Sequence, residues 1–255
     1  MPAPAGLPNL GNTCFLNASL QVLRRWDVAE ASEHPQKIRS QLGRAWQDGR
    51  QHDAHEVVLA LLDMWNDPIQ TGDLDSVVKC GATDDISVVT EPFCVLSLPL
   101  APDLAQSLHQ FENQEEELTG ENVWISEKAR QRRVTPARSL KSMRVRRWPP
   151  GGVLLHLKRF SNARRKLGAP VELPARWGRA RLAAAALHWG GGAQGGHYTA
   201  VVRAEGDDDN TWYHCDDSSV TPMTAEEALD RVRQQAYLAL YLPQASESSS
   251  LDWWR

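Results

Sequence analysis

Apolar residues recur at helical spacing in the first quarter of the chain. They predict one helix over residues 13–25, a short helix around Gln36–Trp46 and a helix over Gln51–Asp67. The third helix is expected to end near Pro68, because proline lacks the backbone N–H that continues the helical hydrogen bonds. The opening part of the chain is therefore predicted to be helical.

From about Val77 onward the pattern changes to one typical of strands. Ile86–Leu100 and Gly151–Phe160 are rich in β-branched and apolar residues, and the segments HYTAVVRA, TWYHCDD and AYLALYLP have the same character. Residues 101–120 favour a short helix and a polar loop. Arg181–Trp189 fits a helix by its alanines, and it fits a strand equally well by its short length and glycine-rich exit.

Helices first and a mostly antiparallel sheet afterwards indicate an α+β fold rather than alternating βαβ units. With 255 residues the chain is long enough for one large domain or two small ones. We expect one domain over residues 1–243, with helices in about 1–75 and strands in about 76–243. Residues 244–255, rich in serine and glutamate, are expected to form a disordered tail.

Composition narrows the class of protein. Hydrophobic residues make up 42% of the chain, which allows a sizeable core, and the formal net charge of −4 gives no sign of broad nucleic-acid binding. Four widely spaced cysteines are no disulfide framework for a chain this long, and they fit a reducing compartment. The N-terminus has no signal-peptide pattern, and no apolar stretch of about 20 residues exists. We expect a soluble, monomeric, intracellular protein of the cytoplasm, the nucleus or both, without membrane or nucleic-acid partners.

Candidate chemistry begins at Cys14, which follows a turn-rich lead-in and opens the first predicted helix. Unpaired N–H groups and the helix dipole favour an anion at a helix start, so a thiol there has a lowered pKa and can act as a nucleophile. The alternative is a small buried hydrophobic residue, which is what most free cysteines are. The rest of the chain has to decide between the two.

A thiol nucleophile needs a base and a group that orients the base. His197 stands at the start of a predicted strand, behind a glycine-rich loop in which Gly195 and Gly196 allow close approach by a substrate backbone. Asp216 and Asp217 follow the short strand expected to pair with it, where a carboxylate can fix the tautomer of a histidine and stabilise its charged form. The ordinary alternatives are a satisfied histidine at a strand end and a solvated turn.

Asn9 lies in the turn before Cys14. A side-chain amide in that turn can donate to a developing oxyanion, as amides do in other acyl-transfer sites. An Asx-turn is the alternative on local sequence alone.

Together these segments resemble the ubiquitin-specific proteases, a family of cysteine deubiquitinases. The stretch GLPNLGNTCFLNASLQVL resembles the cysteine box of that family, and GGHYTAVVR followed by WYHCDDSSVTPMT resembles its histidine box. Between them, QHDAHEVVLALLD, EPFCVLSLPL, LTGEN and VLLHLKRFS are similar to other recurrent stretches, in the order of the family. The resemblance covers nearly everything from Gly6 to Pro243. It implies a papain-like fold with a helical thumb, an antiparallel β palm and a fingers extension that holds the body of ubiquitin.

The resemblance implies a catalytic role for each candidate. Cys14 corresponds to the nucleophile and His197 to its general base. Asp216 corresponds to the orienting acid and Asn9 to the oxyanion-hole residue, while Asp217 occupies the adjacent position that some members use in support of catalysis. The implied reaction is cleavage of the (iso)peptide bond after the C-terminal glycine of ubiquitin, which needs no cofactor.

Substrate-binding residues follow from the same resemblance. Asp53 matches an aspartate that binds the extended C-terminal tail of ubiquitin, and Glu56, one helical turn on, is expected to meet an arginine of that tail. Tyr198 matches an aromatic residue that lines the tail channel, and Gly195 and Gly196 are expected to border it.

The chain departs from the family in the fingers, where many members hold zinc with two CxxC pairs. Cys80 looks like the end of the first pair, but Val77 stands at its partner position, and Ser126 and Ala129 occupy the second pair. One thiolate out of four ligands cannot hold tetrahedral zinc. We therefore expect no bound metal and a reduced fingers region.

Three functions remain open from the sequence. The leading one is an active deubiquitinase, because none of the catalytic residues looks lost. The second is a protease for a ubiquitin-like modifier, since family members choose modifiers through the fingers. The third is a non-catalytic scaffold that binds ubiquitin.

Overall fold

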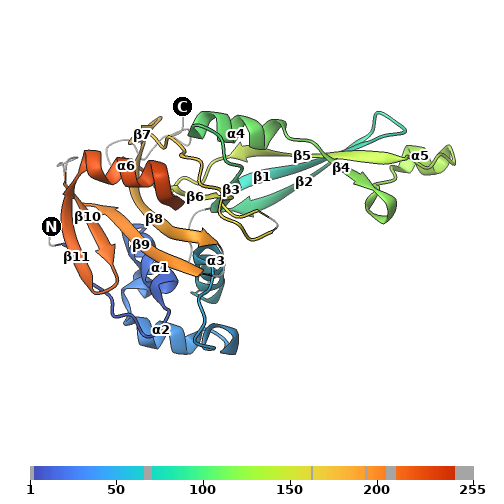
Figure 1. Cartoon of the computed structure of the whole chain (residues 1–255). Helices are drawn as coiled ribbons and strands as arrows, with labels where there is room; N and C mark the ends of the chain where they lie inside the picture. The colour runs from blue at the N-terminus through green and yellow to red at the C-terminus, as the bar shows by residue number, and fades with distance from the viewer. Residues whose placement is uncertain (1–2, 66–70, 162, 193–194, 205–210, 245–255) are drawn as a thin grey trace.

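The computed structural model describes residues 3–65, 71–161, 163–192, 195–204 and 211–244. Residues 245–255, which make up nearly all of the expected tail, lie outside the described residues. The described chain forms a layer of helices, a large palm sheet and a smaller fingers sheet that projects from it (Figure 1). None of the described helices is long and apolar enough to cross a membrane.

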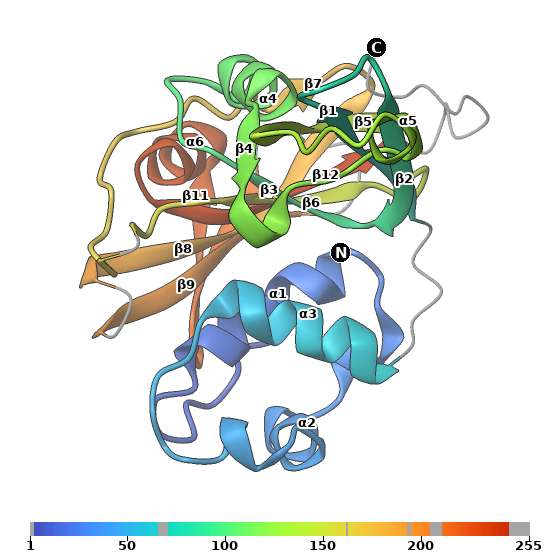
Figure 2. The same cartoon turned by 90° about the vertical axis from the view of Figure 1, so that its right-hand side faces the viewer.

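The helical layer comes first in the chain. It contains α1 (Cys14–Arg25), α2 (Pro35–Gln41) and α3 (Ala54–Trp65), with two 3-10 turns, η1 (Ala29–Ser32) and η2 (Arg44–Trp46). Every residue of α1 from Cys14 to Leu23 is buried, because α1 packs against α3 on one side and the palm sheet on the other. In Figure 2 the whole layer lies on one side of the palm sheet.

The palm sheet has the strand order β11-β10-β9-β8-β12-β6-β3, with β7 added alongside β8. All its neighbours are antiparallel except the parallel pair β3–β6. Helix α6 (Ala225–Gln235) covers the face opposite α1 and begins with a capping box between Thr224 and Glu227. The strands are β3 (Val95–Leu98), β6 (Val153–Leu157), β7 (Arg176–Trp177), β8 (Ala180–Gly192), β9 (Gly195–Arg203), β10 (Thr211–Asp216), β11 (Ser219–Thr224) and β12 (Ala236–Pro243).

The fingers sheet is antiparallel, in the order β2-β1-β5-β4. Helix α4 (Leu104–Asn113) packs against β5, and the tip carries η3 (Gly120–Asn122) and α5 (Glu127–Gln131). In Figure 1 this sheet extends as an arm, with α5 at its far end. The strands are β1 (Gly72–Cys80), β2 (Ile86–Phe93), β4 (Glu116–Thr119) and β5 (Arg138–Arg147).

The ambiguous segment Arg181–Trp189 lies in strand β8, which is buried on both faces. Ala184 and Ala186 belong to the apolar cluster around α1, whereas Ala185 and Leu187 belong to the cluster that contains α6. Small side chains let helices approach this strand from both sides. Alanine favours a helix in an isolated peptide. In this strand it is needed because both faces are closely packed.

The α+β order is confirmed, but several elements differ from the prediction. The short helix expected around Gln36–Trp46 is present as α2 but ends at Gln41, because Leu42 is extended and buries its side chain before η2 begins. Strand β1 begins at Gly72, so the expected division near residue 75 falls inside a strand. Strands β5 and β11 and helix α6 are additional to the predicted elements.

His156 is a core residue of β6, as its apolar surroundings predict. Its Nδ1 lies 2.8 Å from the Ser97 hydroxyl, and its ring stacks on His55 with centroids 3.9 Å apart. Burial, together with the neighbouring charges of His55 and Lys158, lowers the pKa of His156 to about 2. Burial likewise lowers the pKa of His188 to about 4.

These buried imidazoles make the fold sensitive to acid. Below the ordinary histidine pKa of 6.5 the unfolded chain binds a proton on His156 that the folded chain does not, so stability is lost as the pH falls from 6.5 toward 2. The expected loss is about 1.4 kcal/mol per pH unit for this residue, and His188 adds a similar slope down to about pH 4. Urea unfolding at several pH values between 7.5 and 4.5 measures this pH dependence of the free energy of unfolding.

His156→Phe keeps an aromatic ring in the stack but removes the proton. It is expected to reduce the pH slope by about one proton, whereas His109→Gln, at an exposed position of α4, leaves the slope unchanged. An unchanged slope in the His156 variant would contradict this assignment.

Candidate active site

The thiol of Cys14 lies at the first residue of α1 and is only 2% exposed. Burial, helped by the charge of Asp217, raises the pKa of this thiol, although the backbone N–H groups of Tyr198 and Phe15 point at the sulfur and partly offset it. In the part of the chain that the structure describes, no hydrogen bond joins the sulfur to His197. The helix start was expected to lower this pKa, and that prediction is wrong for the unbound site, because desolvation outweighs the N–H groups.

His197 lies on β9, directly before the residue whose N–H faces the sulfur. Its Nε2 lies 2.6 Å from Oδ1 of Asp216, the last residue of the neighbouring strand β10. The two side chains are 40% and 45% exposed. The structure thus brings His197 and Asp216 into contact from two strands, and Cys14 lies against the backbone of Tyr198, the residue that follows His197. The prediction that β10 pairs with β9 is confirmed.

Asp217 joins the β10–β11 turn to the lead-in of α1. Its Oδ2 accepts from Nδ2 of Asn9 at 2.8 Å, and its Oδ1 accepts from Nδ2 of Asn17 at 2.8 Å. Its carbonyl accepts from the N–H of Leu7, and its φ of 50° is in the left-handed region that aspartate tolerates. One carboxylate therefore holds two amides from the segment that carries Cys14.

The orientation of Asn9 is fixed at both ends. Its Oδ1 accepts from the N–H groups of Gly11 and Thr13, which is the Asx-turn considered above, while its Nδ2 donates to Asp217. An amide nitrogen carries two protons. The second proton therefore stays available for an oxyanion, so that the turn and the chemical role are compatible.

Sequence reasoning missed two residues of this region, Asn17 and Gln51. Asn17 is a polar residue buried in the middle of an apolar helix, which is the signal that marks it. Gln51 bonds both backbone groups of Gly196: its Nε2 donates to the carbonyl at 2.6 Å, and the Gly196 N–H donates to its Oε1 at 3.1 Å. This double contact ties the helical layer to β9 beside His197.

The expected substrate-binding residues gather at the start of α3. Asp53 caps this helix by accepting from the N–H groups of His55 and Glu56, and its other oxygen accepts from Tyr237. The buried Tyr198 ring lies next to Tyr237, and the Ala54 N–H points at its hydroxyl. Beside them is a polar hollow of about 790 Å³, lined by Asn12, Asp48, Gly49, Arg50, Gln51, His52, Asp53, Glu56 and Arg164.

The two glycines before His197 differ in their surroundings. A Cβ on Gly196 would come within 2.5 Å of the His188 ring and the Trp189 carbonyl, so glycine is needed there for contact within the protein. Nothing lies within 4 Å of such an atom on Gly195, which leaves that position open to a substrate.

Among the described residues, His197, Asp216 and Asp217 are the group whose ligand atoms lie close enough together to hold a metal ion. Four of their polar atoms already have partners: Nε2 of His197 contacts Oδ1 of Asp216, and both oxygens of Asp217 accept from amides. Acidic groups in such contacts need no cation. The arrangement suits a histidine that is oriented for proton transfer.

A thiol at the start of a buried helix, beside a strand that carries a carboxylate-paired histidine, resembles the arrangement of residues that cysteine proteases use. Residues 27–241 match the family model described as ubiquitin carboxyl-terminal hydrolase. The chain belongs to this family. The matched residues begin after Cys14, so the resemblance of the cysteine segment to the family does not depend on this match.

Relatives agree with this assignment. Ubiquitin carboxyl-terminal hydrolase 23 of Arabidopsis thaliana is 25% identical over 313 residues, which cover 93% of this chain and 35% of that protein. Ubiquitin carboxyl-terminal hydrolase 17-like protein 5 of Homo sapiens is 25% identical over 306 residues, which cover 93% of this chain and 56% of that protein. The chain thus spans from about a third to just over half the length of these relatives.

Solved structures show the same fold. The SAGA DUB module Ubp8/Sgf11/Sus1/Sgf73 bound to monoubiquitin matches with a TM-score of 0.73 and 20% identity, over 94% of this chain and 69% of that chain. The same module bound to ubiquitin aldehyde matches with a TM-score of 0.70 and 19% identity, over 94% and 70%. The predicted fold class is confirmed.

The protonated state of Cys14 leads to a prediction. Iodoacetamide is expected to alkylate Cys14 of the unbound protein slowly at pH 7, at a rate that keeps rising above pH 9, because the thiol pKa lies above its ordinary value of 9.0. Peptide mapping by mass spectrometry measures the rate at this residue. His197→Ala is the control and should leave the profile nearly unchanged. A plateau with an apparent pKa below 7 would contradict the structure.

Proposed function

We propose that this chain is a thiol-dependent deubiquitinase that hydrolyses the (iso)peptide bond after the C-terminal glycine of ubiquitin. The observation that carries the proposal is the meeting of Cys14 with β9 at Tyr198, directly after His197, which itself bonds Asp216. The family supplies the substrate class, since its model is named for hydrolysis at the ubiquitin carboxyl terminus.

Each residue has a role in the proposed reaction. The Cys14 sulfur gives its proton to His197 and attacks the carbonyl carbon of the terminal glycine. The free proton of the Asn9 amide and the Cys14 N–H stabilise the oxyanion. His197 then protonates the leaving lysine amine, a thioester forms, and water deprotonated by His197 hydrolyses it. Asp216 keeps the imidazole oriented and stabilises its charged form.

Substrate binding is expected to activate the nucleophile. The unbound thiol is buried, neutral and not bonded to His197. A tail that enters beside α3 brings its own carbonyl to the sulfur, and the contact between sulfur and imidazole is expected to tighten in that complex, so that the proton passes to His197 as the new bond forms. Asp53 and Glu56 supply negative charge for a basic residue of the tail, and Tyr198 and Gly195 border its path.

An electrophilic probe tests the proposal directly. Ubiquitin with a C-terminal electrophile is expected to label the wild-type chain under reducing conditions and to leave Cys14→Ala unlabelled, because the bond forms at that sulfur. The shift in mass on a gel measures it. Failure of the wild type to react would overturn the proposal, and labelling only by probes built on ubiquitin-like modifiers would assign the chain to those substrates.

Asp217 is expected to act by holding Asn9 rather than by touching the substrate. Asp217→Ala should lower kcat for a fluorogenic ubiquitin C-terminal amide by about 10²–10³-fold with little change in KM, since an oxyanion donor loses its position. Asp217→Asn tolerates the same backbone angle but can accept from only one of the two amides, so its kcat should be intermediate.

Asp230→Ala, at an exposed position of α6, is the matched control and should stay within about twofold of wild type. A kcat within threefold of wild type for Asp217→Ala would rule out this positioning role.

A further inference from the structure

The tip of the fingers is held by hydrogen bonds. The Thr83 hydroxyl of the β1–β2 turn lies 3.0 Å from the Ser126 hydroxyl, which also accepts from the N–H of Ala129 at the start of α5. Cys80 lies beneath them: burial would raise the pKa of its thiol, but hydrogen bonds from Thr83, Ser126 and Ala82 lower it to about 7. Three of the four positions that resemble a zinc site, Cys80, Ser126 and Ala129, thus lie close together, and serine and alanine do not supply the thiolates that zinc needs there.

The segment that begins at this tip with α5 and returns along the arm as β5 is strongly basic. Residues 128–147 contain nine Lys or Arg residues and no Asp or Glu, although the formal net charge of the whole chain is −4. Three of the nine have acidic partners, because Arg138 contacts Glu117, Arg146 contacts Asp75 and Arg147 contacts Asp73. The basic residues of this run are Lys128, Arg130, Arg132, Arg133, Arg138, Lys141, Arg144, Arg146 and Arg147.

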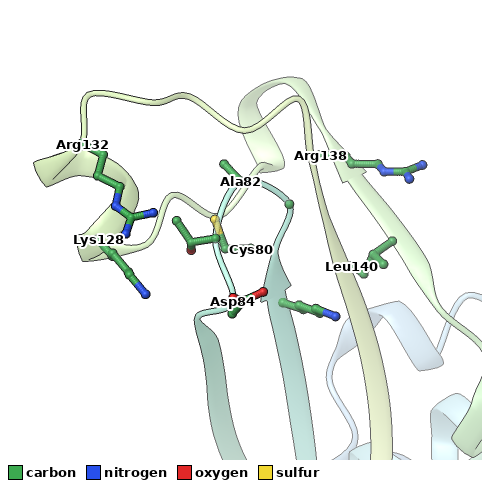
Figure 3. Close-up of a pocket in the computed structure, with 10 residues that line it drawn as sticks. Cys80, Ala82, Asp84, Lys128, Arg132, Arg138 and Leu140 are labelled. Atoms are coloured by element: carbon green, nitrogen blue, oxygen red, sulfur yellow. The ribbon is translucent and has the colours of Figure 1, made fainter.

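Part of this charge surrounds a hollow of about 500 Å³ at the tip. Figure 3 shows Lys128 and Arg132 extending from the α5 side toward the turn that carries Cys80, Ala82 and Asp84. Lys79, Lys128 and Arg132 make no ion pair within 4.0 Å among the described residues, and Asp84 is the acidic residue of the lining. The lining residues are Lys79, Cys80, Gly81, Ala82, Thr83, Asp84, Lys128, Arg132, Arg138 and Leu140.

We propose that this fingertip hollow is a docking site for an acidic segment of another protein, whose carboxylates pair with Lys79, Lys128 and Arg132. Lys79, Lys128 and Arg132 have no ion pair within 4.0 Å among the described residues, and Lys128 and Arg132 outnumber the one carboxylate, Asp85, on which both act. The resulting positive potential attracts such a segment and orients it. The site lies on the arm, apart from Cys14 and His197, and it is independent of the proposed hydrolysis.

Two features favour a peptide over a nucleic acid. Apolar side chains accompany the cations, since Leu140 and Ala82 line the hollow and Ile86, the cross-strand partner of Lys79, is 58% exposed. No aromatic side chain is present among the described lining residues to stack on bases, and Asp84 interrupts the positive surface that a phosphate backbone would follow.

Fluorescence anisotropy with a labelled twelve-residue peptide of alternating Glu and Leu measures the docking, in 0.15 M salt where the Debye length is about 8 Å. The substitutions Lys79→Glu, Lys128→Glu and Arg132→Glu together are expected to weaken binding by at least about tenfold. Arg130→Glu, Arg133→Glu and Arg144→Glu together change the net charge equally but do not line the hollow, so they should weaken binding by less than about threefold. Circular dichroism checks that both triple variants fold. If either does not, alanine replaces glutamate at the same three positions in both variants.

Each outcome decides the question. Loss of binding in the first variant alone supports the hollow as the docking site. Equal loss in both variants shows attraction by general charge and overturns the proposal, as does absence of binding by the wild type. Tighter binding of a twelve-residue oligodeoxythymidylate than of the peptide would also overturn it, by assigning the hollow to nucleic acid.

Discussion

Ten consecutive residues at the start of α1, from Cys14 to Leu23, are buried between α3 and the palm sheet. A helix that is enclosed on all sides cannot rotate or slide without opening cavities, each of which costs about 24 cal/mol per Å³. The position of its first residue, Cys14, relative to β9 is therefore fixed, next to Tyr198 and its neighbour His197. The alanines of β8 and the contact of Asp217 with the lead-in serve the same arrangement: the small side chains let the sheet approach this helix closely, and the carboxylate fixes the segment before it.

Much of the palm could be predicted from sequence, because its strands bury one or both faces and so carry a clear apolar pattern. Strand β5 could not, since the fingers sheet is thin and every residue of Arg138–Arg147 except Ser139 is partly or fully exposed, which removes the alternation. Strand β11 lies at the edge of the palm sheet, and most of its residues are exposed. Helix α6 had a usable signal in the capping-box residues Thr224 and Glu227.

The site shows a similar division. Cys14, His197 and Asp216 stand out because their residue types and local settings are unusual. In the structure His197 contacts Asp216, and Cys14 lies against the residue that follows His197. Asn17 and Gln51 act through partners 200 and 145 positions away in the chain, so no spacing could reveal them. The thiol pKa was mispredicted from sequence because the helix start is visible in the pattern of residues whereas the depth of burial is not. A nucleophile that is neutral when unbound is protected from oxidants, since the thiolate is the form that they attack.

The double hydrogen bond between Gln51 and Gly196 has a pharmacological consequence. The proposed nucleophile is carried by the helical layer and the proposed base by the palm sheet, and the Gln51 amide bridges the two layers next to His197. A compound that competes for the Gly196 backbone groups would release this end of β9 from the helical layer and loosen the position of His197, while α1 stays packed. Such an inhibitor would need no electrophile and no contact with Cys14, and its potency would depend on how well it reproduces one donor and one acceptor.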